Sequence, residues 1–330
     1  MILITGGAGF IGHGIVAQLN RMGRQDLIIA DNIGSSSKWK NLVDKKIMRY
    51  LPREQLGTWL TEDPEASKLS AIIHMGACSH TSEQNMDYLT QHNFQASLML
   101  YRECCRRQIP FLYASSAATY GNGEHGYKDD DTSFEKIVPI NRYGLSKHWF
   151  DRWVLCQEQR PPFWCGFKFF NVFGPGEYHK GEMRSLVCKA VPQIQTSQQL
   201  KLFRSHRTGI ADGQQLRDFI YIKDVVQVVV QTLLRAEAGD RRLQSGVYNV
   251  GTGKARSFYD LGAAVFNAMD VPLKIDWIDI PSAIREGYQY YTEADLTRLK
   301  NQLGYTDSFT SLEDAVTEYV QEYLLLERSL

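Results

Sequence analysis

The sequence predicts an α/β protein with a doubly wound parallel sheet, and two features of the chain carry that prediction. Short apolar runs alternate with helical or loop stretches, which is the rhythm of an open parallel sheet with helices on both faces. The first of these runs leads directly into a glycine-rich turn. The predicted strands are residues 2–5, 27–30, 71–74, 111–115 and 166–170.

The glycine-rich turn separates the strand at residues 2–5 from a helical stretch at 15–19. Glycines permit a tight turn, let the backbone approach a pyrophosphate and allow close packing of helix on sheet. The helix N-terminus offers free N–H groups to the anion. Asp31 ends the next apolar run, about 20 residues further on, where a carboxylate meets an adenosine ribose hydroxyl. We therefore predict a Rossmann-type dinucleotide site. Its contacts in the turn are Gly6, Gly9, Phe10, Ile11 and Gly12.

Charge and cysteine content exclude several classes of protein. The 330 residues include 37 basic and 37 acidic side chains, so no basic surplus points to nucleic acid. The six cysteines form no C-x-x-C pair and have no histidine spacing that would build a zinc site, so we expect reduced thiols and no metal. Met1 leads straight into a strand, and no run approaches the ~18 apolar residues of a membrane span. We expect a soluble, cytoplasmic protein.

The alternation of strands and helices changes after Asn171, which predicts a second, smaller domain. Residues 173–176 (Phe-Gly-Pro-Gly) break regular structure. We expect residues 217–222 and the helix after them to return to the first sheet, because 247–250 reads as another strand. The predicted division is discontinuous. A dinucleotide-binding domain comprises 1–171 plus about 217–250, and a smaller α/β substrate-binding domain comprises about 172–216 plus 251–330.

Two further helices are predicted near the C-terminus. Residues 257–269 read as a helix with Ser257 as its N-cap, and residues 312–326 as a last amphipathic helix.

Tyr143 and Lys147 are four residues apart in a predicted helix, so they lie on one helix face. A phenol has a pKa of about 10, and a nearby ammonium with a positively charged nicotinamide would bring it within range of a base. Ser116, at the end of a predicted strand, can orient a reacting oxygen against Tyr143. Tyr-x-x-x-Lys is common by chance, and a surface lysine beside a core tyrosine is the ordinary alternative. The glycine-rich turn and Ser116 upstream favour the catalytic interpretation.

The glycine-rich strand start, the hydroxyl-bearing strand end and Tyr-x-x-x-Lys, in that order, resemble the extended short-chain dehydrogenase/reductase family. Members of this family act largely on nucleotide sugars, and the resemblance covers the whole chain. Members that eliminate water carry an Asp-Glu pair just after the position of Ser116, whereas Ala117 and Ala118 stand here. The resemblance therefore leaves epimerases, reductases and simple dehydrogenases.

Further stretches narrow the resemblance to the ADP-L-glycero-D-manno-heptose 6-epimerases, an isomerase group of the same family that serves the lipopolysaccharide inner core. These stretches are 74–79, 171–175 with His179-Lys180-Gly181, 201–203, 217–219, 288–289 and 292–297. The resemblance implies inversion of a heptose carbon through transient oxidation to a ketone, with hydride returned to the other face. Because the two orientations need acid/base groups on opposite sides, Tyr143 is matched to one and Lys180 to the other. From sequence alone, a lone lysine in a polar loop is ordinarily solvated.

The cofactor assignment rests on the residues around Asp31. This carboxylate alone favours NAD, because it repels a 2′-phosphate. Asn32, Ser35 to Ser37 and Lys38 follow, and together they can accept a phosphate. The resemblance implies NADP, which we predict, with NAD as the alternative. The other cofactor contacts it implies are Arg53, Met75, Gly76, Ala77, Cys78, Ser79, Asn93, Lys147 and Lys180.

The ADP-sugar contacts are expected to follow strand ends and to come from the second domain. The predicted substrate residues are Ser116, Asn171, Val172, Glu182, Lys189, Phe203, Arg204, Ser205, His206, Arg217 and Tyr288. Glu182 and Lys189 depart from the family, which often has Ser and His there, and residues 204–215 form a more basic and longer loop. Arg217 suits a phosphate or a structural carboxylate.

Two alternatives remain open at this point. Another nucleotide-sugar epimerase or a reductase of the same fold would share these motifs, and a non-catalytic dinucleotide-binding regulator would share the fold alone. The resemblance also implies a homo-oligomer, with a pentamer suggested.

Overall fold

The computed structural model describes residues 1–130, 132, 134–285, 287–328 and 330. Its centre is a seven-stranded sheet in which every neighbouring pair of strands is parallel. In spatial order the strands are β10 (Gly246–Val250), β6 (Trp164–Phe169), β5 (Phe111–Ser116), β4 (Ala71–His74), β1 (Ile2–Thr5), β2 (Leu27–Asp31) and β3 (Arg49–Pro52). The predicted doubly wound parallel sheet is confirmed.

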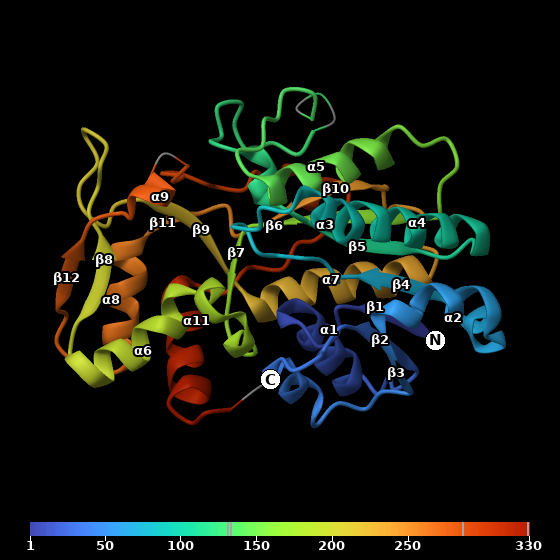
Figure 1. Ribbon diagram of the computed structural model, residues 1–330, viewed down its shortest axis with the longest axis horizontal. Helices are drawn as coiled ribbons and strands as arrows, with labels where there is room; N and C mark the ends of the chain where they lie inside the picture. Colours follow the sequence, from blue (N-terminus) through green and yellow to red (C-terminus); the bar gives the residue numbers. More distant parts are fainter. Residues whose placement is uncertain (131, 133, 286, 329) are drawn as a thin grey trace.

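Helices cover both faces of this sheet, as Figure 1 shows. On one face lie α3 (Met86–Leu89), α4 (Ala96–Arg107) and α5 (Arg142–Leu155), and on the other α1 (Phe10–Arg21) and α7 (Ile222–Glu237). The helix α2 (Leu56–Glu62) packs in the same apolar cluster as α4 and α5. The chain adds β2 and β3 on one side of β1 and then crosses to add β4 on the other side. The direction in which successive strands are added therefore reverses beside β1. Ligands of such sheets bind at this point, outside the carboxyl ends of the strands.

A second group of elements lies at the other end of the molecule (Figure 1). It contains a parallel pair, β8 (Leu200–Phe203) with β12 (Ile275–Ile278), and a mixed sheet of β7 (Asn171–Phe173), β9 (Leu216–Tyr221) and β11 (Ala255–Ser257). Of the remaining helices, α6 (Leu186–Ser197), α8 (Phe258–Ala268), α9 (Ser282–Arg285) and α11 (Leu312–Glu318) lie with this group, whereas α10 (Thr297–Asn301) packs against β10 of the large sheet. Among these, α8 packs against both α6 and α11.

The strand at residues 217–222 does not return to the first sheet, so that prediction is wrong. As β9 it pairs with β7 and β11 in the mixed sheet, and only α7 and β10 rejoin the large sheet and its helices. A strand's sequence shows that it is buried but not which neighbour accepts its hydrogen bonds. The strand β3 was not predicted, because it is a mostly exposed edge strand that ends in Pro52 and so lacks an apolar run.

The two helices predicted near the C-terminus are present in altered form. Ser257 caps α8 as predicted, with its Oγ accepting from Asp260 N at 2.9 Å. Asp260 Oδ2 accepts from Ser257 N at 3.1 Å, which completes a capping box. The helix predicted at 312–326 is α11 followed by a wider helical turn at Tyr319–Leu324.

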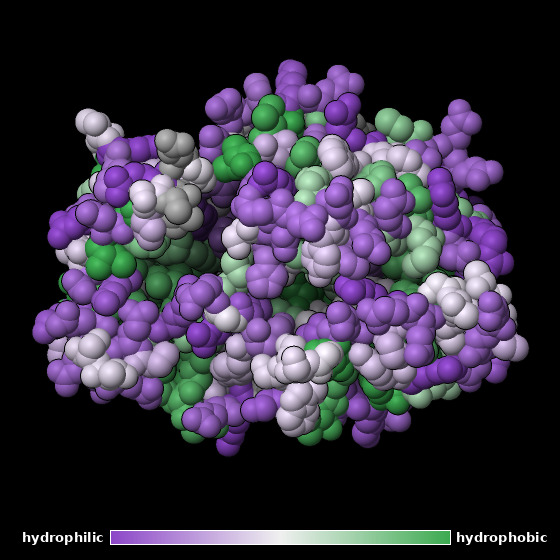
Figure 2. Space-filling view, viewed as in Figure 1, coloured by the Kyte–Doolittle hydropathy of each residue, from purple (hydrophilic) through white to green (hydrophobic). Residues whose placement is uncertain are grey.

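The surface in Figure 2 is mostly hydrophilic on the face shown, with hydrophobic residues in small separate groups. Within the residues that the structure describes, no helix combines the length and the apolar character needed to cross a membrane.

Candidate active site

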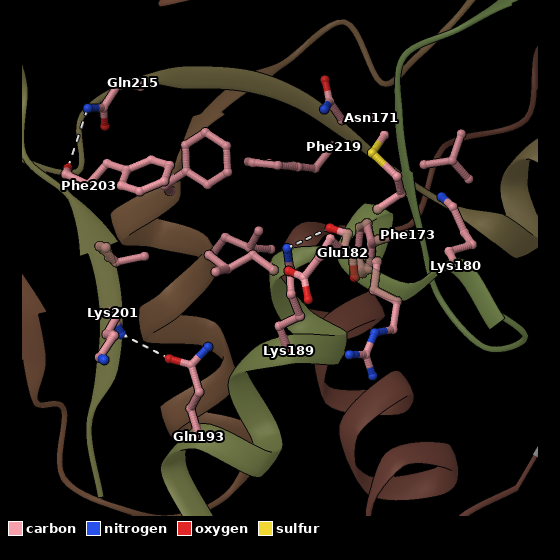
Figure 3. Close-up of a pocket in the computed structure, with 18 of the residues that line it drawn as sticks. Asn171, Phe173, Lys180, Glu182, Lys189, Gln193, Lys201, Phe203, Gln215 and Phe219 are labelled. Carbon is pink, nitrogen blue, oxygen red and sulfur yellow. Dashed lines mark hydrogen bonds between the residues drawn. The ribbon is translucent and has the colours of Figure 1, made fainter. Parts of the chain in front are cut away.

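Two cavities open at the carboxyl ends of the central strands and between the two groups of elements. The first, which we call the glycine cavity, has a volume of about 780 Å³ and is lined by the turn at residues 6–12 and by the ends of β2 and β4. The second, the small-sheet cavity, has a volume of about 610 Å³ and is lined by residues of β7, β8, β9, α6 and α8 (Figure 3). Most of the predicted cofactor residues line the glycine cavity: Gly6, Gly9, Phe10, Ile11, Gly12, Asp31, Asn32, Lys38, Arg53, Met75, Gly76, Ala77, Cys78, Ser79 and Lys180.

The glycines of the turn are required by close backbone approaches. Gly6 has a φ of +67°, and a Cβ there would lie 2.6 Å from Gly76 N. A Cβ on Gly12 would lie 2.1 Å from Gly6 O. Gly9 is the N-cap of α1 and makes no side-chain cap, so the start of the helix is left open to a ligand. The turn therefore fits a dinucleotide pyrophosphate.

Asp31 is held rigidly at the end of β2. Its Oδ2 accepts a hydrogen bond from Ala8 N at 2.9 Å, and its Oδ1 accepts from Asn32 N at 2.7 Å and from Lys38 Nζ at 2.6 Å. The Asp31 side chain is only 7% exposed. Because Lys38 compensates the carboxylate, its repulsion of a second anion nearby is reduced.

Two predicted cofactor residues, Asn93 and Lys147, do not line the glycine cavity. Asn93 is fully buried. The Asn93 side-chain amide is hydrogen-bonded to both backbone groups of Cys78. Its Oδ1 accepts from Cys78 N at 2.8 Å, and its Nδ2 donates to Cys78 O at 3.0 Å. Nδ2 also donates to Ser146 Oγ at 2.9 Å. Asn93 thus fixes the loop after β4 against α5 from behind.

Tyr143 and Lys147 lie on the buried face of α5, which Asn141 caps by accepting from Gly144 N at 2.7 Å. The Lys147 ammonium donates to Ala114 O at 2.8 Å, and burial lowers its pKa to about 8. Burial raises the pKa of Tyr143, and a hydrogen bond with Ser116 opposes that rise. Desolvation is the largest influence on the phenol, so the Tyr143 pKa is raised on balance, and Lys147 is not among the groups that shift it.

Neither Tyr143 nor Ser116 contributes to the lining of the two cavities, although Cys78 and Ala114 beside them do. The Ser116 hydroxyl accepts from Ala118 N at 3.1 Å, which starts a short turn after β5. The hydrogen bond between Ser116 and Tyr143 holds the two side chains together, close to Ala114 and Cys78, which do line the glycine cavity.

Lys180 lines both cavities. It lies in the short helical turn Tyr178–Met183, with its N–H donating to Glu177 O at 3.0 Å. Its ammonium lies 4.9 Å from the centre of the Phe10 ring, at the start of α1. Burial lowers the pKa of Lys180, while Glu177 partly opposes that shift. Lys180 is therefore not the solvated surface lysine that is usual in a polar loop.

The predicted substrate residues divide into two sets. Those that line the small-sheet cavity are Asn171, Val172, Glu182, Lys189, Phe203 and Tyr288. Glu182 is bonded through its carbonyl oxygen to Lys189 Nζ at 2.9 Å (Figure 3).

The second set, Arg204, Ser205, His206 and Arg217, is absent from the lining. The loop after β8 folds on itself, with Ser205 N donating to Asp212 Oδ1 at 2.8 Å. Arg217 lies behind Phe258 and Tyr288, with its guanidinium 5.7 Å and 5.4 Å from the two ring centres. It donates to the carbonyl oxygens of Leu216 and Gln289.

Sequence reasoning missed two sets of lining residues. The first, in the glycine cavity, is Tyr88, Gln91, His92, Gln95 and Met99. Their spacing of three and four residues is the signal of one helix face and could have been found. The second, in the small-sheet cavity, includes Gln215, Phe219 and Phe258. These come from separate segments and leave no local pattern in the sequence.

This fold with this pair of cavities defines a dinucleotide-dependent enzyme of the sugar-nucleotide type. The chain belongs to the NAD dependent epimerase/dehydratase family, whose model matches residues 2–251.

Relatives that match over their full length indicate which enzymes of this family the chain resembles. The chain is 43% identical over 337 residues to the ADP-L-glycero-D-manno-heptose-6-epimerase of Fusobacterium nucleatum, covering 100% of this chain and 99% of that one. It is 46% identical over 324 residues to the enzyme of the same name from Nitratidesulfovibrio vulgaris strain Hildenborough, covering 98% of each. The crystal structure of the Helicobacter pylori ADP-L-glycero-D-manno-heptose-6-epimerase aligns with a TM-score of 0.78 at 28% identity, covering 97% of this chain and 95% of that one.

Proposed function

We propose that this protein converts ADP-D-glycero-D-manno-heptose to ADP-L-glycero-D-manno-heptose by inverting C6, which supplies a precursor of the lipopolysaccharide inner core. The observation that carries the proposal is the position of Lys180, which lines both the glycine cavity and the small-sheet cavity. A sugar held in the second cavity would meet a dinucleotide held in the first at this residue. The names of the full-length relatives support the same reaction.

The residues of the glycine cavity fit a nicotinamide dinucleotide, because a Cβ at Gly6 or Gly12 would fill the cradle of the turn. A nicotinamide dinucleotide held there would supply the hydride transfer that oxidises C6 and then reduces it again. Tyr143 and Lys180 hold or accept the proton of the 6-hydroxyl in its two orientations. Ser116 orients that oxygen beside Tyr143. Burial lowers the pKa of Lys180, the direction that favours its use as an acid or base.

NADP is the cofactor that we propose, with NAD as the alternative. Asp31 is already paired with Lys38, so its repulsion of a 2′-phosphate is reduced. Asn32, Ser36 and Arg53 line the same part of the glycine cavity and supply further donors.

We also propose that the chain divides into 1–171 plus 222–250 for the dinucleotide and 172–221 plus 251–330 for the sugar. This division moves β9 (Leu216–Tyr221) to the second part, whereas the predicted range of about 217–250 placed it in the first. A cytoplasmic homo-oligomer, with five subunits suggested by the resemblance, completes the proposal. Light scattering of the purified protein measures the number of subunits.

The test is to incubate the purified protein with ADP-D-glycero-D-manno-heptose, without added cofactor, and follow the proton spectrum of the sugar. Conversion by the parent protein and none by Tyr143→Phe supports the proposal, because an epimerase keeps its cofactor through each cycle. A reductase of the same fold would need added reduced cofactor. Turnover of a UDP-sugar in place of the ADP-heptose would overturn the choice of substrate.

A further inference from the structure

A buried ion pair lies behind the face of α5 that carries Tyr143 and Lys147. Asp151 follows Lys147 by four residues, so the three side chains lie along one helix face. Asp151 Oδ2 is 2.7 Å from Lys168 Nζ on β6, and both side chains are 0% exposed. Desolvating two charges offsets most of their attraction, so a pair this deep is weak evidence for stability alone.

The Asp151 carboxylate ties α5 to two neighbouring strands. Its Oδ1 accepts from the Tyr113 hydroxyl at 2.9 Å and its Oδ2 accepts from Ser115 Oγ at 2.6 Å, both on β5. The register of β5 and β6 places Ser115 directly beside Lys168. One carboxylate therefore receives three donors and fixes the helix against the middle of the sheet.

The other end of the ion pair reaches the segment that carries Ser116. Lys168 Nζ donates to Thr119 Oγ1 at 2.6 Å, and Thr119 Oγ1 donates to Ser116 O at 2.8 Å. Lys147 on α5 also contacts the strand that ends at Ser116, because its Nζ donates to Ala114 O on β5 at 2.8 Å. Continuous hydrogen bonds thus connect the ion pair on α5 to β5 and to the segment that carries Ser116.

We propose that the Asp151–Lys168 pair positions the reacting groups: it holds the face of α5 that carries Tyr143 and Lys147 against the strand end that carries Ser116. The pair acts through these residues and lies outside both cavities. The inference rests on the proposed function, because it assigns Tyr143, Lys147 and Ser116 to a reaction.

Asp151 also sets the charge of Lys147. Burial lowers the Lys147 pKa, and Asp151 is the largest influence that raises it, followed by Cys78 in the loop after β4. His74 on β4 is the other titratable group that interacts with this ammonium, and burial holds the pKa of His74 at about 3, so it is neutral. Without the Asp151 charge, the Lys147 pKa must fall below about 8.

The test is Asp151→Asn, measured by the ¹³C resonance of the Lys147 ε-carbon and by the pH profile of epimerisation. We expect the Lys147 titration and the alkaline decline of activity to move to lower pH together. The turnover number falls about tenfold or more, because small displacements of reacting groups are costly, while KM for the sugar changes less than about twofold. An unmoved titration and an unmoved profile in a folded variant would overturn the proposal.

Thr119→Val keeps the proposal falsifiable if Asp151→Asn does not fold. This change removes only the hydrogen bonds of Thr119 Oγ1 with Lys168 Nζ and Ser116 O. The turnover number should therefore fall while the pH at which Lys147 titrates stays unchanged. Full turnover in Thr119→Val would count against the link. Asp224→Asn is the matched control, because the Asp224 carboxylate accepts two bonds of 2.9 Å from Thr310 far from α5. It should lower thermal stability and leave the pH profile unchanged.

The experiment separates this inference from the proposed function. If the parent protein does not convert ADP-heptose, the proposed function fails, and the Lys147 titration still decides whether Asp151 sets the charge of that lysine. If the parent converts the sugar and Asp151→Asn matches it at every pH, the positioning role fails alone.

Discussion

The glycine cavity and the small-sheet cavity are built from different parts of the polypeptide. The turn of the glycine cavity depends on backbone atoms that approach so closely that a Cβ at Gly6 or Gly12 has no room. The small-sheet cavity is lined by side chains from β7, β8, β9, α6 and α8, several of them exposed. A wall made of backbone tolerates no added atom, whereas a wall made of side chains can adjust to a replacement. Substitutions in the two cavities should therefore differ in severity.

The largest effect is expected from Gly12→Ala. The added Cβ would meet Gly6 O at 2.1 Å, so the turn must open and dinucleotide binding should be lost, with activity below about 1% of the parent. Calorimetric titration with NADP measures the affinity. Gly57→Ala is the matched control, because its Cβ meets only Met99 Sδ, at 3.8 Å. Normal NADP affinity in Gly12→Ala would contradict the backbone account.

Lys180→Met should lower turnover about 100-fold, the usual contribution of a general acid or base. The exposed Lys254 supplies the control Lys254→Met, which should match the parent. Steady-state rates on ADP-heptose check both variants. The assignment of two acid/base groups is wrong if Lys180→Met keeps the parent rate while Tyr143→Phe abolishes it.

The pH dependence should follow Lys147, whose pKa burial lowers to about 8. The Lys147 ammonium, which donates to Ala114 O, is charged only below that pKa, so activity should be present at lower pH and lost as pH rises through about 8. The turnover number should fall about tenfold for each pH unit above it. Lys147→Arg keeps its charge in this range, so its decline should shift upward. Identical profiles for both proteins would exclude Lys147 as the titrating group.

Lys38→Met tests the choice of cofactor within the glycine cavity. It removes the partner of Asp31 and a donor for a 2′-phosphate, so NADP affinity should fall about tenfold while NAD affinity changes about twofold or less. Lys40→Met, two residues along the same turn and exposed, is the control. Equal losses for NADP and NAD would show that Lys38 does not select the phosphate.

The smallest effect is expected from Lys189→Met in the small-sheet cavity. Lys189 Nζ is bonded to Glu182 O at 2.9 Å in an exposed segment, where a single charge contributes little. KM for the sugar should rise about two- to threefold with unchanged turnover. A loss as large as that of Gly12→Ala would remove the difference between the two cavities.

The same difference explains which features could be predicted from sequence. The turn at residues 6–12 and Asp31 were identified because backbone geometry demands glycine at fixed spacings. The position of Arg204 to His206 outside the cavity lining could not be predicted, because their loop folds on itself through Asp212, a tertiary contact with no local signal. Phe219 and Phe258 were missed for the same reason. The Asp151–Lys168 ion pair could not be predicted from the sequence either, because the register of β5 and β6, which is a tertiary feature, brings the two residues together.

The most direct test of the central claim is to follow deuterium placed at C6 of ADP-D-glycero-D-manno-heptose. Removal and return of a hydride within one site predicts a product that keeps the deuterium at C6, in ordinary water and without transfer to unlabelled sugar in the same tube. Mass and proton spectra of the product measure both quantities. Loss of the deuterium to solvent would mean that the carbon is inverted by proton exchange, and it would contradict the account.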